Sequence, residues 1–275
     1  MKIGLSTQLL LNHRLTTVWL DRIWHAGFPL VEIFCSRRHL DYQNRAQINE
    51  LGHWFRDSEL KLHSLHSPKF NDESGGRSGP RSAVNITDVV KSQRMEAVAE
   101  VKRALEVAEV IPFTYLVQHL GTVDEEFEEA KMEAALTSLE ELRLFANQRG
   151  VEILLENTFN GLSTAERLHH FLGLTHLKLG FCFDTGHAHL CGSVENEFHL
   201  MADRVRSTHI SDNDGKTDSH SYPLDGKGTI DWPATMKLLG SRAAQFPLLL
   251  EVRDPDVERP LDHAKKTGLE LLSLI

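Results

Sequence analysis

The sequence has few cysteines, and their spacing excludes the usual structural roles of that residue. The three, Cys35, Cys182 and Cys191, are odd in number and form no Cys-x-x-Cys pair. Disulfide frameworks and zinc ribbons need cysteines in pairs, so we expect reduced and mostly buried thiols instead.

Long apolar runs and a leader segment are also missing. No stretch approaches the roughly 18 consecutive apolar residues of a membrane-spanning helix. The chain begins Met1-Lys-Ile-Gly-Leu-Ser and enters a strand-like segment at once, without the apolar centre of a signal peptide. We therefore expect a cytoplasmic protein that does not enter a membrane.

Acidic side chains outnumber basic ones, 39 to 30, which limits the classes of molecule that the protein can bind. The formal net charge is −9 at pH 7, and such a surface disfavours non-specific binding to nucleic acid or anionic membranes. DNA remains open as a partner, because divalent cations bound in one cleft can reverse the field there. Histidine is abundant, with 16 residues, and those within helical patterns, such as His169 and His170, are interpreted as surface or structural.

Strand-like and helix-like segments alternate along the chain. Strand-like apolar runs occur near residues 2–5, 30–34, 61–65, 114–118, 151–155, 179–183, 205–210 and 247–251. Helix-like runs follow near 16–26, 44–58, 88–109, 124–149, 163–173, 195–202, 231–239 and 257–274. This alternation over 275 residues predicts a single α/β domain, a (β/α)8 TIM barrel spanning 1–275. No glycine-rich dinucleotide fingerprint follows the first strand, which argues against a Rossmann fold.

Three local features refine this prediction. Two long loops, 66–87 and 211–229, follow predicted strands and would overhang the C-terminal face of the barrel. The acidic run 124–129 is expected to begin a helix, because carboxylates favour the positive end of a helix dipole. Simple alternation along the strand near 61–65 places His63 on the opposite side from residues 62 and 64, so we leave it out of the site.

Metal-type side chains stand at or near the ends of four successive strand-like runs. These side chains are Glu156, Asp184, His209 and Glu251. In a parallel barrel the strand ends meet on the C-terminal face, where such enzymes build their sites. Any one of them could be a polar strand end satisfied by a loop, but four in register favour a metalloenzyme. Carboxylates with one histidine suit Mn²⁺, Mg²⁺ or Co²⁺, and also Zn²⁺.

Further candidate ligands occupy equivalent places. His66 and His119 follow two other strand-like runs, and His187 lies three residues after Asp184. Asp218 and His220 form an Asp-x-His pair in the long loop after the seventh strand-like run. Such short spacings can place two ligand atoms on one turn. We also consider other side chains on this face as pocket residues, namely His189, Arg37 and Lys227.

Several motifs carry a resemblance to a known family. They are "ENT" at 156–158, "FDTGHAH" at 183–189, "HISDND" at 209–214, "PLDGKGTIDW" at 223–232 and "LLLEV" at 248–252. In this order they resemble the xylose isomerase-like TIM-barrel superfamily. That grouping contains sugar isomerases and epimerases and also DNA-repair enzymes of the endonuclease IV type.

The isomerase and epimerase branch implies one divalent metal held by Glu156, Asp184, His209 and Glu251. The two glutamates would double as catalytic proton-transfer groups, acting on a small sugar or sugar phosphate through an enediolate. His187 would then hydrogen-bond a substrate hydroxyl, and Arg37 or Lys227, on loops over the face, could contact a phosphate if the substrate carries one. The outer helices of such barrels often pair into homo-oligomers, but no pairing face is evident.

The endonuclease IV branch instead implies three zinc ions that hydrolyse DNA at abasic sites. Its nine ligands would be His66, His119, Glu156, Asp184, His187, His209, Asp218, His220 and Glu251. The loop 66–87 offers only a modest DNA footprint in Lys69, Phe70, Arg77 and Arg81. The loop 34–42, Phe-Cys-Ser-Arg-Arg-His-Leu-Asp-Tyr, looks more like that of a sugar isomerase. The loops therefore favour the isomerase or epimerase over the nuclease. A third alternative is non-enzymatic, a barrel that keeps the ligands but serves as a binding or scaffold protein.

Overall fold

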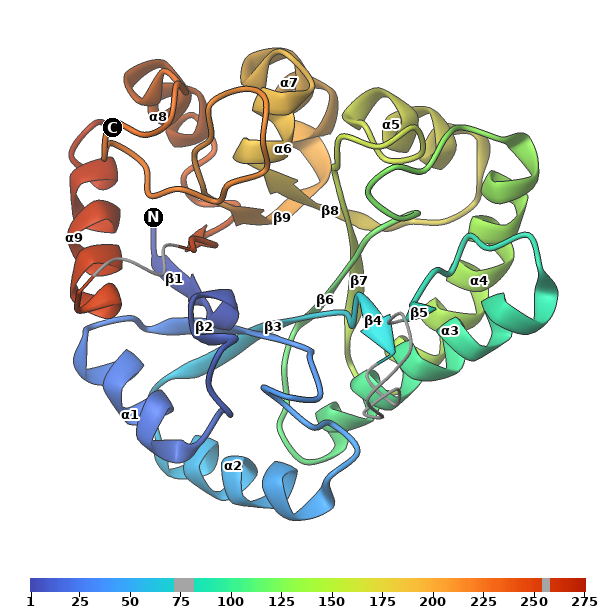
Figure 1. Ribbon diagram of the computed structural model, residues 1–275, viewed down its shortest axis with the longest axis horizontal. Coiled ribbons are helices and arrows are strands. Elements are labelled where there is room, and N and C mark those ends of the chain that lie inside the picture. The colour runs from blue at the N-terminus through green and yellow to red at the C-terminus, as the bar shows by residue number, and fades with distance from the viewer. Residues whose placement is uncertain (72–81, 254–257) are drawn as a thin grey trace.

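Eight parallel strands form a barrel in the computed structural model, which describes residues 1–71, 82–253 and 258–275. Figure 1 shows these strands around a common centre, with helices outside them. The strands are β1 (Ile3–Ser6), β2 (Leu30–Phe34), β3 (Lys61–His66), β6 (Tyr115–Gln118), β7 (Glu152–Glu156), β8 (Gly180–Asp184), β9 (Val205–His209) and β10 (Leu248–Leu250). Their order is β10-β1-β2-β3-β6-β7-β8-β9.

The two outermost strands of this order, β10 and β9, meet and close the barrel. The Ile210 amide donates a hydrogen bond to the Leu249 carbonyl at 2.8 Å. The Glu251 amide donates to the Ile210 carbonyl at 3.1 Å. The prediction of a single (β/α)8 TIM barrel is therefore confirmed.

Most of the helices form the outer layer and bury one face each, whereas the short α6 lies at the end of β8 (Figure 1) and is mostly buried. The helices are α1 (Thr17–His25), α2 (Arg45–Asp57), α3 (Lys91–Leu105), α4 (Glu129–Asn147), α5 (Ala165–Leu174), α6 (Thr185–Leu190), α7 (Val194–Met201), α8 (Trp232–Gly240) and α9 (Pro260–Leu272), with short 3₁₀ turns η1 (Thr7–Leu10), η2 (Glu106–Glu109) and η3 (Ala202–Arg204). In α2, for example, Ile48 and Leu51 are buried one turn apart, and Asn44 caps the first turn. Among the described residues, none of these helices is long and apolar enough to cross a membrane.

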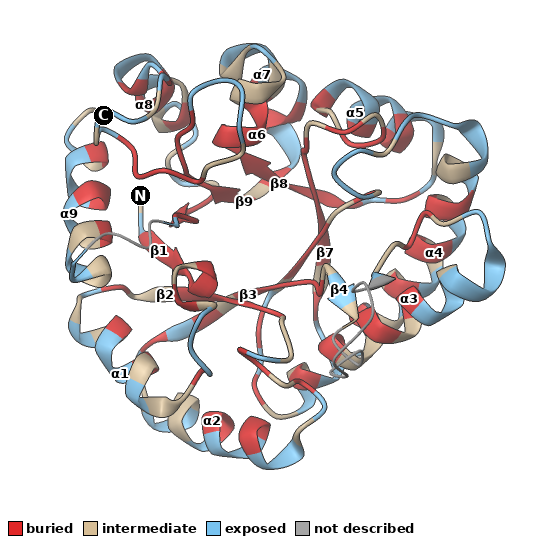
Figure 2. Ribbon diagram, in the orientation of Figure 1, coloured by how far each residue is buried: buried red, intermediate tan, exposed pale blue. Residues whose placement is uncertain are grey.

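Burial divides the molecule into an apolar layer and a polar interior at one end. Figure 2 shows the strands and the inward helix faces buried and the outer faces exposed. The main apolar core lies between sheet and helices, and a small second cluster of Val117, Leu154 and Cys182 packs with Tyr115. Polar and charged side chains are buried where the strands end, and that end positions the site.

The acidic run near 124 does not begin a helix, which corrects the sequence expectation. The helix α4 starts at Glu129. The Glu125 carboxylate instead accepts hydrogen bonds from the Thr122 amide and hydroxyl, each at 2.9 Å, and from the Asn85 amide group at 3.0 Å. These local donors hold the segment as a loop and outweigh the helix-dipole preference.

The two long loops contain structure that the sequence did not indicate. Strands β4 (Phe70–Asn71) and β5 (Ser82–Ala83) form an antiparallel pair within the first loop. The predicted DNA contacts Arg77 and Arg81 lie outside the described residues. In the second loop, Asp212 and Ser221 exchange backbone hydrogen bonds at 2.9 and 2.8 Å, so the residues between them are tied back to the barrel.

A break in strand register explains the position of His63, which differs from the expectation. The pairing of β2 with β3 shifts between Val31 and Glu32, as a β-bulge does. His63 Nε2 lies 3.2 Å from the Ser207 hydroxyl of β9. Because β3 and β9 are not neighbours in the sheet, this contact crosses the barrel interior. Simple alternation therefore gave the wrong side for this residue.

Candidate metal centre and adjoining cavity

Four strand ends bring their polar side chains together. Glu156, Asp184 and His209 are the last residues of β7, β8 and β9, and Glu251 directly follows β10. One ligand atom from each lies within 4.8 Å of the others. All four side chains are at most 1% exposed. The parallel register of the barrel thus assembles the predicted core set from segments far apart in sequence.

Two further groups of ligand-type side chains flank this core. His66 and His119 form one with Glu156, and His187, Asp218 and His220 form the other. His119 Nε2 lies 2.7 Å from Glu156 Oε2, and His66 Nε2 lies 3.5 Å from the same oxygen. All nine candidate ligands from the sequence therefore gather in three adjacent groups, with Glu156 shared by two of them.

The third group depends on the second long loop. Asp218 Oδ2 lies 3.6 Å from His187 Nε2 and 3.3 Å from His220 Nε2. His220 takes a left-handed backbone conformation, with φ of 49°, and its Nδ1 lies 3.1 Å from the Glu251 carbonyl oxygen. The loop therefore delivers both residues to the strand ends, next to α6.

Sequence reasoning missed Glu32, a buried carboxylate in contact with His209. Glu32 Oε1 lies 3.0 Å from His209 Nε2, and the Glu32 carboxylate also accepts hydrogen bonds from the hydroxyls of Ser6 and Ser64. His209 Nδ1 lies 3.0 Å from Glu156 Oε1. If His209 binds a metal, Glu32 would hold the proton on Nε2 and leave Nδ1 to act as the ligand atom, as carboxylates behind metal-bound histidines do.

A signal for Glu32 was present in the sequence. It is the one charged residue in the apolar run Leu30-Val-Glu-Ile-Phe34. A carboxylate in a buried strand needs a partner, because burying an unpaired charge is costly. That argument points to a buried partner but does not identify His209, since the bulge at this strand hides which way the side chain faces.

The carboxylates of the core have unequal electrostatic environments. Burial raises the pKa of Asp184 and of Glu251 above their ordinary values. Burial also opposes ionisation of Glu156, but the neighbouring His209 and His119 outweigh it and hold the Glu156 pKa well below its usual range. The pKa of His209 is well above its ordinary value despite burial, because acidic groups including Glu251 favour the charged ring. A bound cation would take the place of these protons.

Several buried polar atoms at the site have no hydrogen-bond partner, which indicates that these residues fit a metal. His66 Nε2, Asp184 Oδ2, Asp218 Oδ1 and Glu251 Oε1 are all buried without a hydrogen bond. Buried polar atoms nearly always have a partner, and these four come from all three groups. Burial lowers the pKa of His119 to about 3, which keeps a ring nitrogen free to coordinate. The donor set therefore fits divalent cations.

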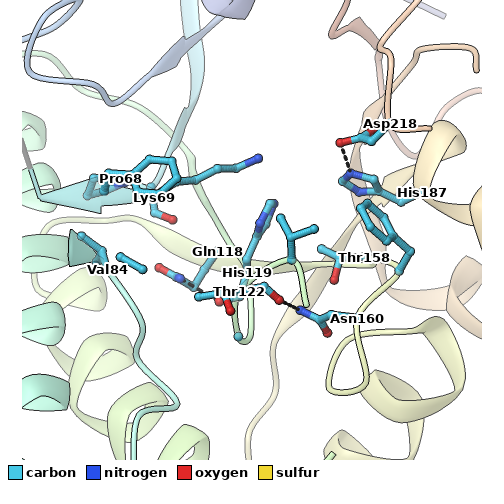
Figure 3. A pocket seen from close by; sticks show the side chains of 16 residues that line it. Pro68, Lys69, Val84, Gln118, His119, Thr122, Thr158, Asn160, His187 and Asp218 are labelled. Atoms are coloured by element: carbon cyan, nitrogen blue, oxygen red, sulfur yellow. Dashed lines mark hydrogen bonds and ion pairs between the residues drawn. The ribbon is translucent and has the colours of Figure 1, made fainter. Parts of the chain in front are cut away.

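A cavity of about 100 Å³ lies beside these groups. Figure 3 shows His187 and Asp218 on one side of it and Lys69 on the other. Its wall is stiffened by Asn160, whose side-chain amide donates to the carbonyls of Leu120 and Thr122 at 2.9 and 2.8 Å. The cavity gives a small ligand access to the region of His119 and His187.

The predicted pocket residues are only partly at this cavity. His187 lines it, whereas His189, Arg37 and Lys227 are not among its lining residues. His189 Nε2 lies 2.8 Å from the Thr229 hydroxyl, and Arg37 lies 3.6 Å from Asp41. Lys227 is exposed on the second long loop.

Comparison with known families identifies the family of this chain. Residues 20–274 match the family described as xylose isomerase-like TIM barrel. The chain belongs to this family. The resemblance drawn from the strand-end motifs is thereby confirmed, and it extends over almost the whole chain.

Two curated relatives have no assigned activity. The uncharacterized protein y4fM of Sinorhizobium fredii is 28% identical over 170 residues, which cover 58% of this chain and 53% of that protein. The chain thus spans about half the length of this relative. The uncharacterized protein MJ1614 of Methanocaldococcus jannaschii is 27% identical over 238 residues, covering 84% of this chain and 85% of that protein.

Solved structures with the same fold include named sugar enzymes. A D-tagatose 3-epimerase-like protein has a TM-score of 0.80 at 23% identity, covering 100% of this chain and 98% of that one. The 3-keto-D-glucoside 4-epimerase YcjR from E. coli has a TM-score of 0.76 at 17% identity, with 99% of both chains covered. The IolI protein with a bound zinc atom has a TM-score of 0.77 at 18% identity, with 99% and 96% covered. Identities this low establish the fold alone.

Proposed function

We propose that this protein is a divalent-metal-dependent isomerase or epimerase of a small sugar or sugar phosphate. The observation that carries the proposal is the pairing of Glu156 and Glu251 around one histidine nitrogen. His209 Nδ1 lies 3.0 Å from Glu156 Oε1 and 3.4 Å from Glu251 Oε2. Two buried carboxylates beside one ligand position suit a reaction in which one group removes a proton and another returns it.

The core residues divide the work of this reaction. A divalent ion held by Glu156, Asp184, His209 and Glu251 would supply Lewis-acid polarisation of a substrate carbonyl and its adjacent hydroxyl. One glutamate takes the proton from the carbon between those groups. The other glutamate delivers a proton to the neighbouring carbon or to the opposite face. His187, at the wall of the cavity, donates a hydrogen bond to a substrate hydroxyl.

The structural neighbours support this class of reaction. Two solved structures with this fold are named as a sugar epimerase or as a protein like one. Two others, the IolI protein and a xylose isomerase-like TIM barrel protein from Mycobacterium smegmatis, are structures with a bound zinc atom and in complex with magnesium. The small cavity beside the core also suits a sugar better than a DNA duplex, and the net charge of −9 agrees with that preference.

A second candidate is phosphodiester hydrolysis at a cluster of three zinc ions. The observation that favours it is the pair of extra ligand groups, His66 with His119 and His187 with Asp218 and His220. An isomerase needs only the core group. Clustered metals instead suit displacement at phosphorus, because they stabilise both the attacking and the leaving oxygen.

Elemental analysis of the protein purified without added metal or chelator separates the two candidates. The isomerase or epimerase proposal expects about one divalent ion per chain. About three zinc ions per chain would favour hydrolysis. In that case an assay on DNA with abasic sites becomes the decisive one.

A further inference from the structure

Lys69 places a positive charge in the cavity without a carboxylate to neutralise it. Lys69 lies three positions after the end of β3 and lines the cavity together with His119 and His187. Its ammonium lies 5.5 Å from the centre of the Phe34 ring. Within residues 1–71, 82–253 and 258–275, Lys69 makes no side-chain hydrogen bond or ion pair.

The backbone holds this lysine in place. The Val84 amide, just after β5, donates a hydrogen bond to the Lys69 carbonyl at 3.0 Å, and Pro68 restricts the preceding backbone angle. Figure 3 shows the Lys69 side chain extending across the cavity, with Gln118 and His119 below it in this view. The ammonium is therefore presented to whatever occupies the cavity rather than to bulk solvent alone.

The acidic side chains around the cavity are already engaged. Asp218, which also lines it, has its carboxylate between His187 and His220. Glu156 contacts His119 and His209. Divalent ions at these groups would add positive charge next to Lys69, so the cavity as a whole attracts an anion.

We propose that Lys69 binds an anionic group of the substrate, a phosphate or a carboxylate, and so selects acidic sugars over neutral ones. The uncharged part of the ligand then lies against Phe159, which lines the same cavity with its ring centre 5.5 Å from that of His187. This inference rests on the proposed sugar chemistry, because it assigns one end of the substrate to Lys69 and the reacting end to the metal ligands.

Calorimetric titration of the metal-loaded protein tests this proposal. The ligands are D-fructose, D-fructose 6-phosphate and D-fructuronate, which share a body and differ in charge. We expect at least one anionic ligand to bind roughly tenfold or more tightly than D-fructose, because a hydrogen bond to a charged group contributes that much. Preference for the 6-phosphate over the carboxylate, or the reverse, identifies which anion the site takes.

Variants of the lysine assign the preference to this residue. In Lys69→Gln the ratio of anionic to neutral affinity should collapse to near one, whereas Lys69→Arg should keep most of it. Lys61→Gln is the matched control, because Lys61 is exposed at the opposite end of β3. Metal content is measured in every variant, so that loss of metal is not mistaken for loss of the anion contact.

Two results would overturn the inference. One is that the wild-type protein shows no preference for the anionic ligands, or binds none of the three ligands measurably. The other is a preference that survives in Lys69→Gln. Neither result decides the proposed reaction, which is tested separately by turnover of a panel of neutral sugars and their phosphates. Conversely, a preference for anions without any sugar turnover would support the lysine contact and argue against the isomerase proposal.

Discussion

His209 stands between two carboxylates of different roles. Its Nε2 lies 3.0 Å from Glu32 Oε1, and its Nδ1 lies 3.0 Å from Glu156 Oε1. Glu32 is the inner partner, held by Ser6 and Ser64, and Glu156 belongs to the candidate metal groups. The orientation of the ring, and thus the nitrogen offered to a metal, depends on a residue outside those groups.

Removing the charge of Glu32 should weaken metal binding without unfolding the protein. In Glu32→Gln the amide no longer favours the proton on His209 Nε2, and we expect the metal affinity to fall about 10- to 100-fold. Competition with a chromophoric chelator measures this change. Glu100→Gln is the control, because Glu100 is also buried but bonds to Tyr42. Equal affinity in Glu32→Gln and wild type would show that Glu32 does not position His209.

The paired glutamates should be indispensable for turnover. We expect Glu156→Gln and Glu251→Gln to lose all measurable activity on an identified sugar, because each removes a proton-transfer group. Circular dichroism should be unchanged in both. Asp218→Asn, which alters only a flanking group, should keep the metal of the core. Wild-type rates in both glutamine variants would mean that the site is assigned to the wrong residues.

His39 should make the protein less stable as the pH falls. It is buried and its Nδ1 donates to the His13 carbonyl at 2.6 Å, and burial lowers its pKa to about 4. An unfolded histidine has a pKa near 6.5. Below that pH the unfolded chain therefore binds a proton that the folded chain does not, and the free energy of unfolding falls until about pH 4.

The variant His39→Asn isolates this effect. An asparagine amide can still donate to the His13 carbonyl but does not titrate. Between pH 7 and pH 5 the wild type should lose about 2 kcal/mol more stability than the variant. Urea unfolding at the two pH values measures the difference, and the other histidines cancel because they are common to both proteins. Parallel losses in the two proteins would contradict the prediction.

Gly228 should tolerate no side chain. A Cβ atom there would lie 1.9 Å from Asp212 Cγ, and that carboxylate accepts hydrogen bonds from the Trp232 indole at 2.6 Å and the Ile230 amide at 3.1 Å. We expect Gly228→Ala to destabilise the protein by about 1–3 kcal/mol. Gly173→Ala is the contrasting control, because a Cβ in that part of α5 meets nothing within 4 Å. It should stabilise by about 0.5–1 kcal/mol, and thermal melts compare the two.

The barrel and the meeting of its four strand-end side chains were predictable from periodic features, whereas the full set of nine candidate ligands came from the family resemblance. Strands that alternate with helices must be parallel, and parallel strands end on one face. A polar residue that ends such a strand, like Asp184, therefore meets others from distant parts of the chain. His187 follows Asp184 closely because the two residues belong to the start of helix α6. Asp184 precedes the helix as its N-cap, and its side chain accepts a hydrogen bond from the His187 amide at 2.6 Å.

The parts that escaped prediction depend on contacts between segments. His63 and Glu32 lie beside a register shift that no local pattern reveals. The segment around Glu125 is held by Asn85, which is 40 residues away. Lys69 could be assigned to the cavity only once the β4–β5 pair fixed its backbone opposite His187. In each case the deciding partner is remote in sequence.

Solvent hydrogen exchange tests the proposed proton transfer most directly. The metal-loaded protein would be incubated in D₂O with a panel of ketoses, aldoses and their phosphates, and the sugars analysed by NMR and mass spectrometry. The account predicts deuterium at the carbon next to the carbonyl of at least one sugar, and none with Glu156→Gln or Glu251→Gln. Turnover of a phosphodiester with no deuterium in any sugar would contradict it.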